Sequence, residues 1–450
     1  MKNIETELQS SEFGEVSFRF PATHTQQAFW YLDRLERGNP AWNIAVRFEL
    51  KGNLDPHRLE AAINVVVNRH ESLRTTFDLN NGEPVQAVHD SAIIPLPVDD
   101  ISSLPEQHRD VIEEELTIAE GEQRFDLAVG PLIRARLLKL EEARHTLLIT
   151  VHHIIADGWS IGILSDEITT CYQNTESLHE LPLQFADYAI WHRDYVESET
   201  AGSINYWRQQ LADLPLCEIT PDLPRSTVKA NNGYILSTLL PEQLITSISK
   251  IALDNQTTLY VAILSALKLL IARYNGQQDI CIGTQFAGRN RTEFERIIGV
   301  FVNTAILRTE LSPRMTFTQL LTAVSHTFEG ALQYAEVPYA NVIASLHTKF
   351  DRSRHIGYSI NFIYQRDFVQ PREFDGITMT PLPSKSPGAI YDLNFFMVRR
   401  ASGWRLSCEY DSQLYLPTTI TTILDQLQSI LSQVIENPCR LLNEFCFDRQ

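Results

Sequence analysis

The sequence predicts an α/β protein made of two lobes, and three observations support this fold class. Segments with strand-like and helix-like patterns alternate along the chain. The length of 450 residues is too great for one hydrophobic core at roughly 150 residues per domain. The composition, 44% hydrophobic and 21% charged, is that of a globular protein. We expect a polar leader over residues 1–17, an N-terminal lobe over 18–180 and a C-terminal lobe over 181–450.

The first lobe begins with a clear strand and helix. Residues 44–50 alternate between apolar and polar, which is typical of a half-buried strand. Asp55 is expected to cap the following helix, with Pro56 in its first turn. Residues 69–77 lead into another strand, and residues 110–122 predict an acidic helix with a solvated face.

The centre of the chain predicts a strand, a sharp turn and a helix. Residues 145–151 (HTLLITV) read as a buried strand that runs into two histidines, and a helix is expected after Gly158. A linker is expected near 174–184. Beyond it, helices are expected within 185–212 and over 258–274, and a final helix over 417–436.

The charge and cysteine patterns exclude several classes. The net charge of −18 argues against nucleic acid and against an anionic membrane surface, since both need a basic footprint. The six cysteines form no CxxC pair, so we expect buried thiols in a reducing compartment. No signal peptide core or membrane-spanning apolar run is present. We expect a soluble cytoplasmic protein.

The turn carries the pattern His152-His153-x-x-x-Asp157-Gly158. Histidine titrates near neutrality, so an imidazole at a strand end can accept a proton in a cleft. We expect one histidine to face the cleft and the other to face the interior. An aspartate four residues later can anchor the turn. Glycine after it permits a positive φ and a close approach of substrate.

Other readings of these residues are weaker. His152 alone reads as a satisfied core histidine. No metal site is expected, because the motif has no third ligand at suitable spacing and the chain has no HExxH. A Ser-His-Asp hydrolase is disfavoured, because Ser160 lies in the expected helix without the G-x-S-x-G turn.

The stretch VHHIIADGWS resembles the HHxxxDG signature of the condensation domains of nonribosomal peptide synthetases. Further segments resemble other motifs of this family, in the family's order, and the resemblance covers roughly residues 18–445. These segments are 20–32 (FPATHTQQAFWYL), 69–77 (RHESLRTTF), 185–195 (FADYAIWHRDY), 298–308 (IGVFVNTAILR), 334–343 (YAEVPYANVI) and 351–365 (DRSRHIGYSINFIYQ). Ala28 departs from the arginine that is usual in the first motif.

The resemblance implies two chloramphenicol acetyltransferase-like lobes arranged as a V, with the active site at their junction. It implies that His153 is catalytic, with the Gly158 N–H facing the developing oxyanion. Asp157 would be structural and paired with Arg289 from the other lobe, beside His152. Substrate-tunnel candidates are Trp159, Asn303 and Ser386, and Asn303 is expected, with Tyr188 and Trp191, chiefly to support the fold.

The implied reaction joins a donor acyl thioester to the amine of an aminoacyl thioester on a carrier protein. No cofactor is expected on the domain itself, since its substrates are carried on phosphopantetheine arms or on coenzyme A. Partners would be an acceptor peptidyl carrier protein, a donor acyl-CoA or carrier protein, and an adjacent adenylation domain. The start at Met1 suggests the first domain of its polypeptide. The donor would then be a fatty acyl group in a starter domain, or would arrive in trans on a separate carrier protein.

Three alternatives share parts of this pattern. An epimerization domain also has HHxxxDG but needs a glutamate base in the C-terminal lobe, and the RHESLRTTF and DYAIW segments favour condensation. A general acyl-CoA acyltransferase shares HxxxDG but not the other motifs. A recruitment domain without activity typically has a degraded motif, whereas the motif here is intact.

Overall fold

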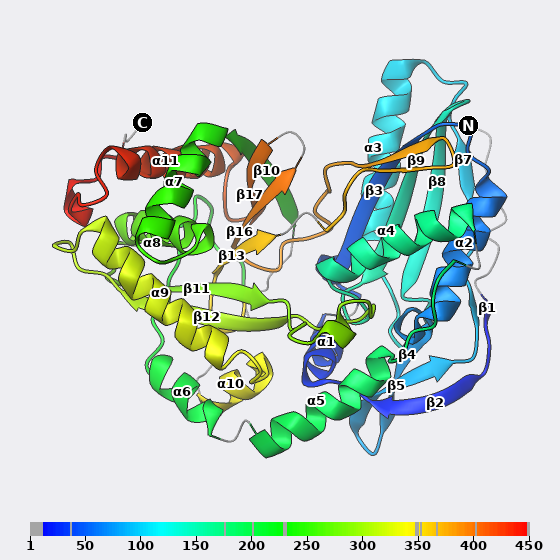
Figure 1. Ribbon diagram of the computed structural model, residues 1–450, viewed down its shortest axis with the longest axis horizontal. Coiled ribbons are helices and arrows are strands. Elements are labelled where there is room, and N and C mark those ends of the chain that lie inside the picture. The colour runs from blue at the N-terminus through cyan, green and yellow to red at the C-terminus, as the bar shows by residue number, and fades with distance from the viewer. Residues whose placement is uncertain are drawn as a thin grey trace. The chain divides into compact units, whose positions relative to one another are not determined.

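The first unit is built on a six-stranded sheet with the strand order β14-β15-β3-β9-β8-β7 (Figure 1). A three-stranded sheet, β2-β5-β4, and the pair β1-β6 complete its strands. Its elements are β1 (Glu12–Phe13), β2 (Val16–Pro21), α1 (His24–Leu35), β3 (Asn43–Lys51), α2 (Pro56–Arg69), β4 (Thr75–Asn80), β5 (Glu83–His89), β6 (Ala92–Ile93), β7 (Val98–Asp100), α3 (Glu106–Glu122), β8 (Ile133–Glu141), β9 (Arg144–His152), α4 (Gly158–Gln173), β14 (Arg372–Phe374) and β15 (Ile377–Pro381), with α5 (Phe185–Glu199) at its boundary and 3-10 helices at Pro40–Trp42, Glu71–Arg74 and Thr292–Phe294.

The coordinates are a computed structural model. It describes residues 12–36, 38–174, 177–199, 202–227, 232–346, 351, 353–365, 368–400 and 403–447. The polar leader expected over 1–17 overlaps β1 and β2, and residues 1–11 lie outside the described part. Phe13 helps to hold β1 in place, because its ring centroid lies 4.4 Å from that of His89.

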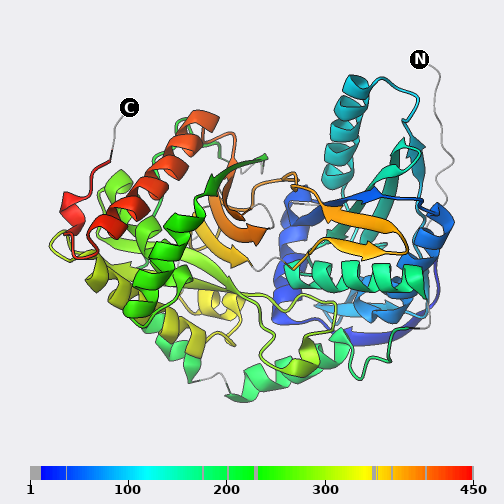
Figure 2. The same cartoon turned by 45° about the horizontal axis from the view of Figure 1, so that its top comes forward.

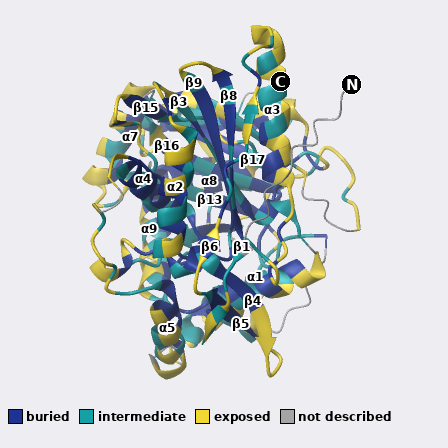
Figure 3. Ribbon diagram, turned by 90° about the vertical axis from the view of Figure 1, so that its right-hand side faces the viewer, coloured by how far each residue is buried: buried dark blue, intermediate teal, exposed yellow. Residues whose placement is uncertain are grey.

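Helices cover both faces of the first sheet. The apolar side chains of β3 and β9 on one face join those of α2 and α4 in the main core of the unit. On the other face, Leu138 and Leu148 pack against Ile112 and Leu116 of α3. Figure 3 shows β8 and β9 as dark blue strands, in keeping with the continuous burial of β9 from His145 to His152. A strand buried on both faces explains the unbroken apolar run that the sequence shows there.

Residues distant in sequence complete the first unit. Its described residues fall within 12–195, 289–301 and 368–387, whereas the sequence analysis placed a single boundary near 180. Strand β15 pairs with β3, with Met379 opposite Leu50, and Figure 2 shows β14 and β15 (orange) beside α4. The apolar side chains of Ile298, Phe374 and Ile377 lie in the core of this unit. Hydrophobic periodicity carries no information about such distant pairing, which is why the sequence showed no break there.

The second unit has its own six-stranded sheet, in the order β10-β17-β16-β13-β11-β12. The helices α6 to α11 share one large apolar core with this sheet. Its elements are α6 (Ser203–Gln210), β10 (Gly233–Leu240), α7 (Glu242–Asp254), α8 (Leu259–Asn275), β11 (Asp279–Phe286), β12 (Asn303–Glu310), α9 (Phe317–Gln333), α10 (Tyr339–Ser345), β13 (Ile360–Gln365), β16 (Leu393–Arg400), β17 (Gly403–Asp411), α11 (Pro417–Glu436) and a 3-10 helix at Leu442–Glu444.

The local expectations for helices and strands are confirmed. Asp55 caps α2 by accepting hydrogen bonds from His57 and Arg58, with Pro56 as the first helical residue. The helices expected over 258–274 and 417–436 are α8 and α11. Among the described residues, no single helix is long and apolar enough to cross a membrane, although the bent pair α7 and α8 meets the criteria jointly. All six cysteines are free thiols, and Cys439 and Cys446 are exposed rather than buried as expected.

Candidate active site

His153 lies immediately after the last residue of β9. Strand β9 pairs antiparallel with β3, and His152 is opposite Asn43 at the end of that ladder. The His153 backbone N–H donates to the carbonyl of Trp42, 2.8 Å away, in the 3-10 helix that precedes β3. This hydrogen bond extends the alignment of the two strands by one residue, so it fixes where the His153 side chain leaves the sheet.

The two histidines have different surroundings. His152 is buried, and its Nδ1 accepts from the backbone N–H of Ile154, 3.1 Å away. Burial, reinforced by His153 and Arg134, lowers the pKa of His152 to about 3. A histidine with this pKa stays neutral at any working pH, with Nδ1 as acceptor. His152 therefore cannot exchange protons with a substrate and belongs to the framework of the turn.

His153 is partly exposed, and its ring stacks on Phe29 of α1. The ring centroids are 5.2 Å apart and the planes are inclined by 21°. Burial lowers the pKa of His153, while its own backbone, Asp157 and Ala156 act in the opposite direction. The imidazole is therefore neutral near pH 7, which is the state that accepts a proton.

Asp157 closes the turn that begins at His153. It is the N-cap of α4, and its Oδ1 accepts from the backbone N–H and the hydroxyl of Ser160, each at 2.8 Å. Its Oδ2 accepts from the backbone N–H of Phe301, 3.1 Å away. These contacts use both carboxylate oxygens in structural hydrogen bonds, so the turn is pinned at its helical end.

The predicted partner of Asp157 is in place. The Nη2 atom of Arg289 donates to both carboxylate oxygens, at 3.1 and 3.3 Å. Its Nη1 atom donates to the carbonyls of Phe294 and Ile297, at 2.5 and 2.7 Å. Burial lowers the pKa of Arg289, and Asp157 opposes that shift. The pair therefore consists of two buried charges whose hydrogen-bonding groups are largely satisfied.

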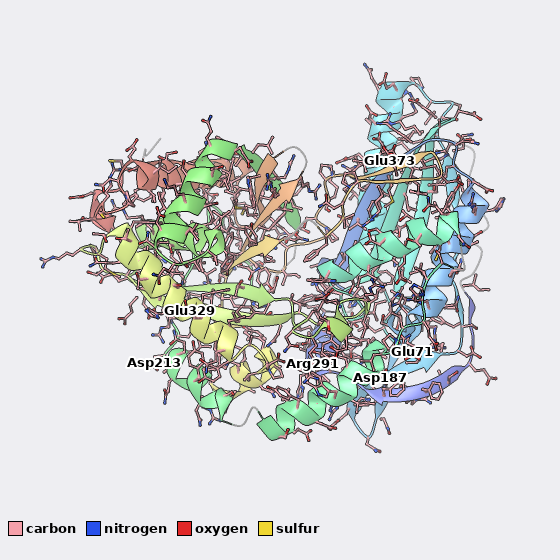
Figure 4. The ribbon with its side chains drawn as sticks, viewed as in Figure 1. Glu71, Asp187, Asp213, Arg291, Glu329 and Glu373 are labelled. Atoms are coloured by element: carbon pink, nitrogen blue, oxygen red, sulfur yellow. The ribbon has the colours of Figure 1, made fainter. Side chains whose placement is uncertain are left out.

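We expected this pair to join one lobe to the other, and this expectation is wrong, because both residues lie in the first compact unit. Arg289 belongs to the first unit, together with Asp157, because residues 289–301 group with that unit. This segment packs through its aromatic side chains. Phe301 lies 4.4 Å from Tyr188 of α5, and the guanidinium of Arg289 lies 4.1 Å above the Phe301 ring. Figure 4 labels Arg291 on this segment and Asp187 on α5.

Ser160 and Gly299 were not singled out as partners by the sequence analysis. The Ser160 hydroxyl lies 2.9 Å from the Gly299 carbonyl, and the Gly299 N–H donates back to the hydroxyl at 3.1 Å. A Cβ atom on Gly299 would lie 2.0 Å from the ring of Phe185. The close approach of the two segments therefore depends on glycine. Its only sequence signal was the presence of Gly299 in the segment 298–308.

Comparison with known proteins gives the family. The family model for the condensation domain matches residues 17–446. Tyrocidine synthase 2 of Brevibacillus parabrevis is 33% identical over 422 residues, which cover 93% of this chain and 12% of the synthase. Gramicidin S synthase 2 of Brevibacillus brevis is 32% identical over 430 residues, which cover 94% of this chain and 9% of that synthase. The chain belongs to the condensation-domain family of nonribosomal peptide synthetases. It spans only a small part of the length of these multidomain relatives.

Solved structures agree with this family at the level of fold. A four-domain nonribosomal peptide synthetase bound to AMP and glycine matches all of this chain with a TM-score of 0.88, at 22% identity and 35% coverage of that chain. The X-domain of teicoplanin biosynthesis, solved in complex with OxyB, matches with a TM-score of 0.84 at 26% identity, covering 96% of each chain. The predicted condensation-domain fold with two α/β lobes is confirmed. Condensation domains are amide-bond-forming acyltransferases, so the expected enzyme class is that of the family.

Gly158 does not use the positive φ that glycine permits. It is the first residue of α4, and it is absent from the described glycines with a positive φ. The turn does not need a left-handed backbone there, because Asp157 is in an extended conformation and α4 begins at Gly158. The N–H groups of the first helical turn have no acceptor within the helix. Gly158 therefore keeps a backbone donor near the end of the motif.

The remaining candidates are placed in packing or surface positions. The indole N–H of Trp159 donates to the Glu295 carbonyl at 3.0 Å. In the second unit, the Asn303 amide donates to the carbonyls of Ala335 and Val337, both at 2.7 Å. Ser386 lines a small pocket of the first unit between α3 and the β3–β9 face. The structure brings His152, His153, Asp157 and Arg289 together, and it does not bring Asn303 into that unit.

Gln26 is a further residue that the sequence analysis did not single out. Its side chain is fully buried, and its Nε2 donates to the Ile154 carbonyl inside the motif, 3.1 Å away. Gln26 also forms a capping box with Thr23 at the start of α1. The sequence signal was the T-x-x-Q spacing, which predicts a helix start but not a contact 128 residues away.

Proposed function

We propose that this domain forms an amide bond between a donor acyl thioester and the amine of an aminoacyl group on an acceptor carrier protein, with His153 as the catalytic residue. The observation that carries the proposal is the placement of His153. The buried network around Asp157 holds the turn from one end, and β3 holds it from the other. The partly exposed imidazole at the strand end is the group that this framework positions.

The role proposed for His153 follows from its protonation state. Burial keeps its pKa low, so the neutral ring accepts the proton that the amine loses as the C–N bond forms. The C–S bond of the donor thioester breaks when the tetrahedral intermediate collapses, and the proton passes from His153 to the thiolate that leaves. An α-amine has a pKa near ~8, so a sizeable fraction is already neutral at pH 7–8. Strong base catalysis is therefore unnecessary. His153 would orient the amine and take its proton late, while approximation of the two thioesters supplies up to about 7–11 kcal/mol.

The oxyanion of the tetrahedral intermediate needs a donor that is fixed in advance. The start of α4 supplies backbone N–H groups with the positive end of the helix dipole, and Gly158 is its first residue. We propose the Gly158 N–H as the donor. His152, Asp157 and Arg289 would act by holding this geometry, and Trp159 and Ser386 remain candidates for the wall of the substrate tunnel.

The substrates would be delivered on phosphopantetheine arms, with an adjacent adenylation domain supplying the acceptor amino acid in the cytoplasm. Two routes are proposed for the donor. In the first, the domain is a starter that takes a fatty acyl group from coenzyme A. In the second, a separate acyl or peptidyl carrier protein brings the donor in trans. The two routes differ in the donor that supports turnover.

A second candidate function is recruitment of a partner protein without catalysis. The similarity to the X-domain, which was solved in complex with OxyB, supports this second candidate. The intact motif and the satisfied network around Asp157 favour catalysis instead.

One assay tests these proposals. The domain is incubated with an aminoacyl-loaded carrier protein and a panel of donors, some on coenzyme A and some on carrier proteins, and the acceptor is followed by intact mass. A mass increase equal to the acyl group supports condensation, and the active donor class identifies the route. If no donor in either class gives an adduct above the enzyme-free control, the catalytic proposal fails and recruitment becomes the better account.

A further inference from the structure

The position of the His153 ring depends on residues outside the HHxxxDG motif. Helix α1 reaches the motif twice, through Gln26 and through Phe29, which are three residues apart and so lie on the same helix face. Gln26 binds the Ile154 carbonyl. Phe29 stacks on the imidazole of His153. Gln26 therefore anchors α1 to the turn three residues before Phe29, which makes the aromatic contact.

Phe29 is itself fixed by Trp42. Their ring centroids are 5.0 Å apart, and the rings meet edge to face at 78°. Trp42 also accepts the backbone N–H of His153 through its carbonyl. The same tryptophan thus fixes the backbone of the histidine and the ring that covers its side chain. Stacked and edge-to-face pairs at these distances are favourable beyond the apolar area that they bury.

We infer that Phe29 is a positioning residue for His153: its ring face sets the plane of the imidazole and excludes water from one side of it. The inference rests on the proposed function, in which His153 is the catalytic group. It extends that function to α1, which carries no group of the HHxxxDG motif.

The charges around His153 define what Phe29 adds. The negative charge of Asp157 raises the pKa of His153, and Arg289 forms an ion pair with the Asp157 carboxylate. His152 on the same strand is neutral. Helix α1 and the 3-10 helix before β3 present Phe29 and Trp42, which do not titrate. Desolvation therefore opposes Asp157, and the cover provided by Phe29 keeps the imidazole neutral at lower pH.

The experiment replaces Phe29 and follows His153 directly. The Phe29→Leu variant keeps an apolar side chain of similar reach without the aromatic face, and Phe29→Tyr keeps the face. Histidines are labelled with carbon-13 at Cε1, and the His153 signal is assigned by its loss in His153→Ala. The matched control is Tyr31→Leu on the same helix, since Tyr31 is 50% exposed.

We expect the His153 signal of wild type to lie upfield through the ring current of Phe29, and to move downfield in Phe29→Leu. The titration of His153 moves to higher pH in this variant, because water reaches the ring. The condensation rate falls about tenfold at saturating acceptor, with an unchanged KM for the acceptor, since a small misplacement of a catalytic group is costly. The acidic limb of the pH–rate profile also moves to higher pH. Phe29→Tyr and Tyr31→Leu keep the wild-type signal and rate.

The inference is overturned if Phe29→Leu is folded and leaves the signal, the titration and the rate of His153 unchanged. It is also overturned if Phe29→Tyr loses the same activity as Phe29→Leu. Phe29→Met serves as the second aliphatic variant where Phe29→Leu melts too early to measure. The resonance and titration of His153 do not need turnover, so a wild-type domain without activity would refute the proposed function while still deciding whether Phe29 positions the ring.

Discussion

The Nη2 atom of Arg289 lies 3.1 Å from Oδ1 of Asp157, and their side chains are 0% and 5% exposed. The two residues are 132 positions apart in the chain. Asp157 caps α4 directly after the His153 turn, and Arg289 begins the segment 289–301. One buried ion pair therefore joins the helix that follows the motif to a segment whose neighbours in sequence belong to the second unit. This pair makes the geometry of the turn depend on residues far from the motif.

Removal of either charge should destabilise the first unit. Asp157→Ala leaves the buried guanidinium of Arg289 unpaired, and Arg289→Ala leaves the carboxylate unpaired, each at a cost of about 3–5 kcal/mol. The double variant loses both charges and should be destabilised by much less than the sum. Thermal and urea unfolding of the four proteins measures this coupling. Strictly additive losses would rule out the pair as a unit, and an inactive Asp157→Ala protein of unchanged stability would indicate a direct chemical role.

A methyl group at Gly299 should also destabilise the first unit. Its Cβ would lie 2.0 Å from the ring of the buried Phe185, so either the ring or the backbone of the segment must shift. Gly299→Ala is expected to lower the free energy of unfolding by about 1–3 kcal/mol, the usual cost of overpacking.

Gly202→Ala is the matched control for this change. Gly202 has φ of −74°, and no heavy atom lies within 4 Å of the point where its Cβ would stand. The control should stay within about 0.5 kcal/mol of wild type. Equal unfolding midpoints for the two glycine variants in urea would contradict the contact between Gly299 and Phe185.

His152 should make the domain less stable as the pH falls. Its folded pKa is about 3, below the ordinary value near ~6.5 that applies in the unfolded chain. The unfolded state therefore binds a proton between these values and the folded state does not. Stability is lost from about pH 6.5 downwards, at up to about 1.4 kcal/mol per pH unit.

His152→Asn isolates this contribution, because its amide oxygen can accept the Ile154 N–H without titrating. Urea unfolding at pH 7.5, 6.0 and 5.0 should give a shallower loss of stability for the variant. His192, whose burial lowers its pKa to about 4, is present in both proteins and cancels from the comparison. Parallel curves for the two proteins would mean that His152 is protonated in the folded state.

Local patterns predicted the parts of the site that depend on neighbouring residues. The strand ending at His152, the helix after Asp157 and the Asp55 cap of α2 follow from periodicity and capping, which act over a few residues. The assignment of Arg289 came from the family resemblance, and its contact with Asp157 is present. Its inclusion in the first unit could not be predicted, because no local pattern reports where a long loop packs.

Contacts over long sequence distances account for the rest. Phe29 lies 124 positions before His153 in the chain. The hydrophobic periodicity of α1 does not indicate that the two rings stack. The pairing of β15 with β3 joins residues more than 300 positions apart, as in Thr378 opposite Lys51. The backbone conformation of Gly158 is a separate case. Glycine permits a positive φ without requiring it, so its presence after Asp157 could not decide the conformation.

The central claim is that the imidazole of His153 acts in amide formation, and His153→Ala tests it most directly. The measurement is single-turnover condensation with the best donor found, read as intact mass of the acceptor carrier, with a thermal melt to check folding. The account predicts a fall of at least about 100-fold in rate, as is usual for a proton-transfer group, at a melting temperature close to wild type. A folded His153→Ala protein that condenses at the wild-type rate would contradict it.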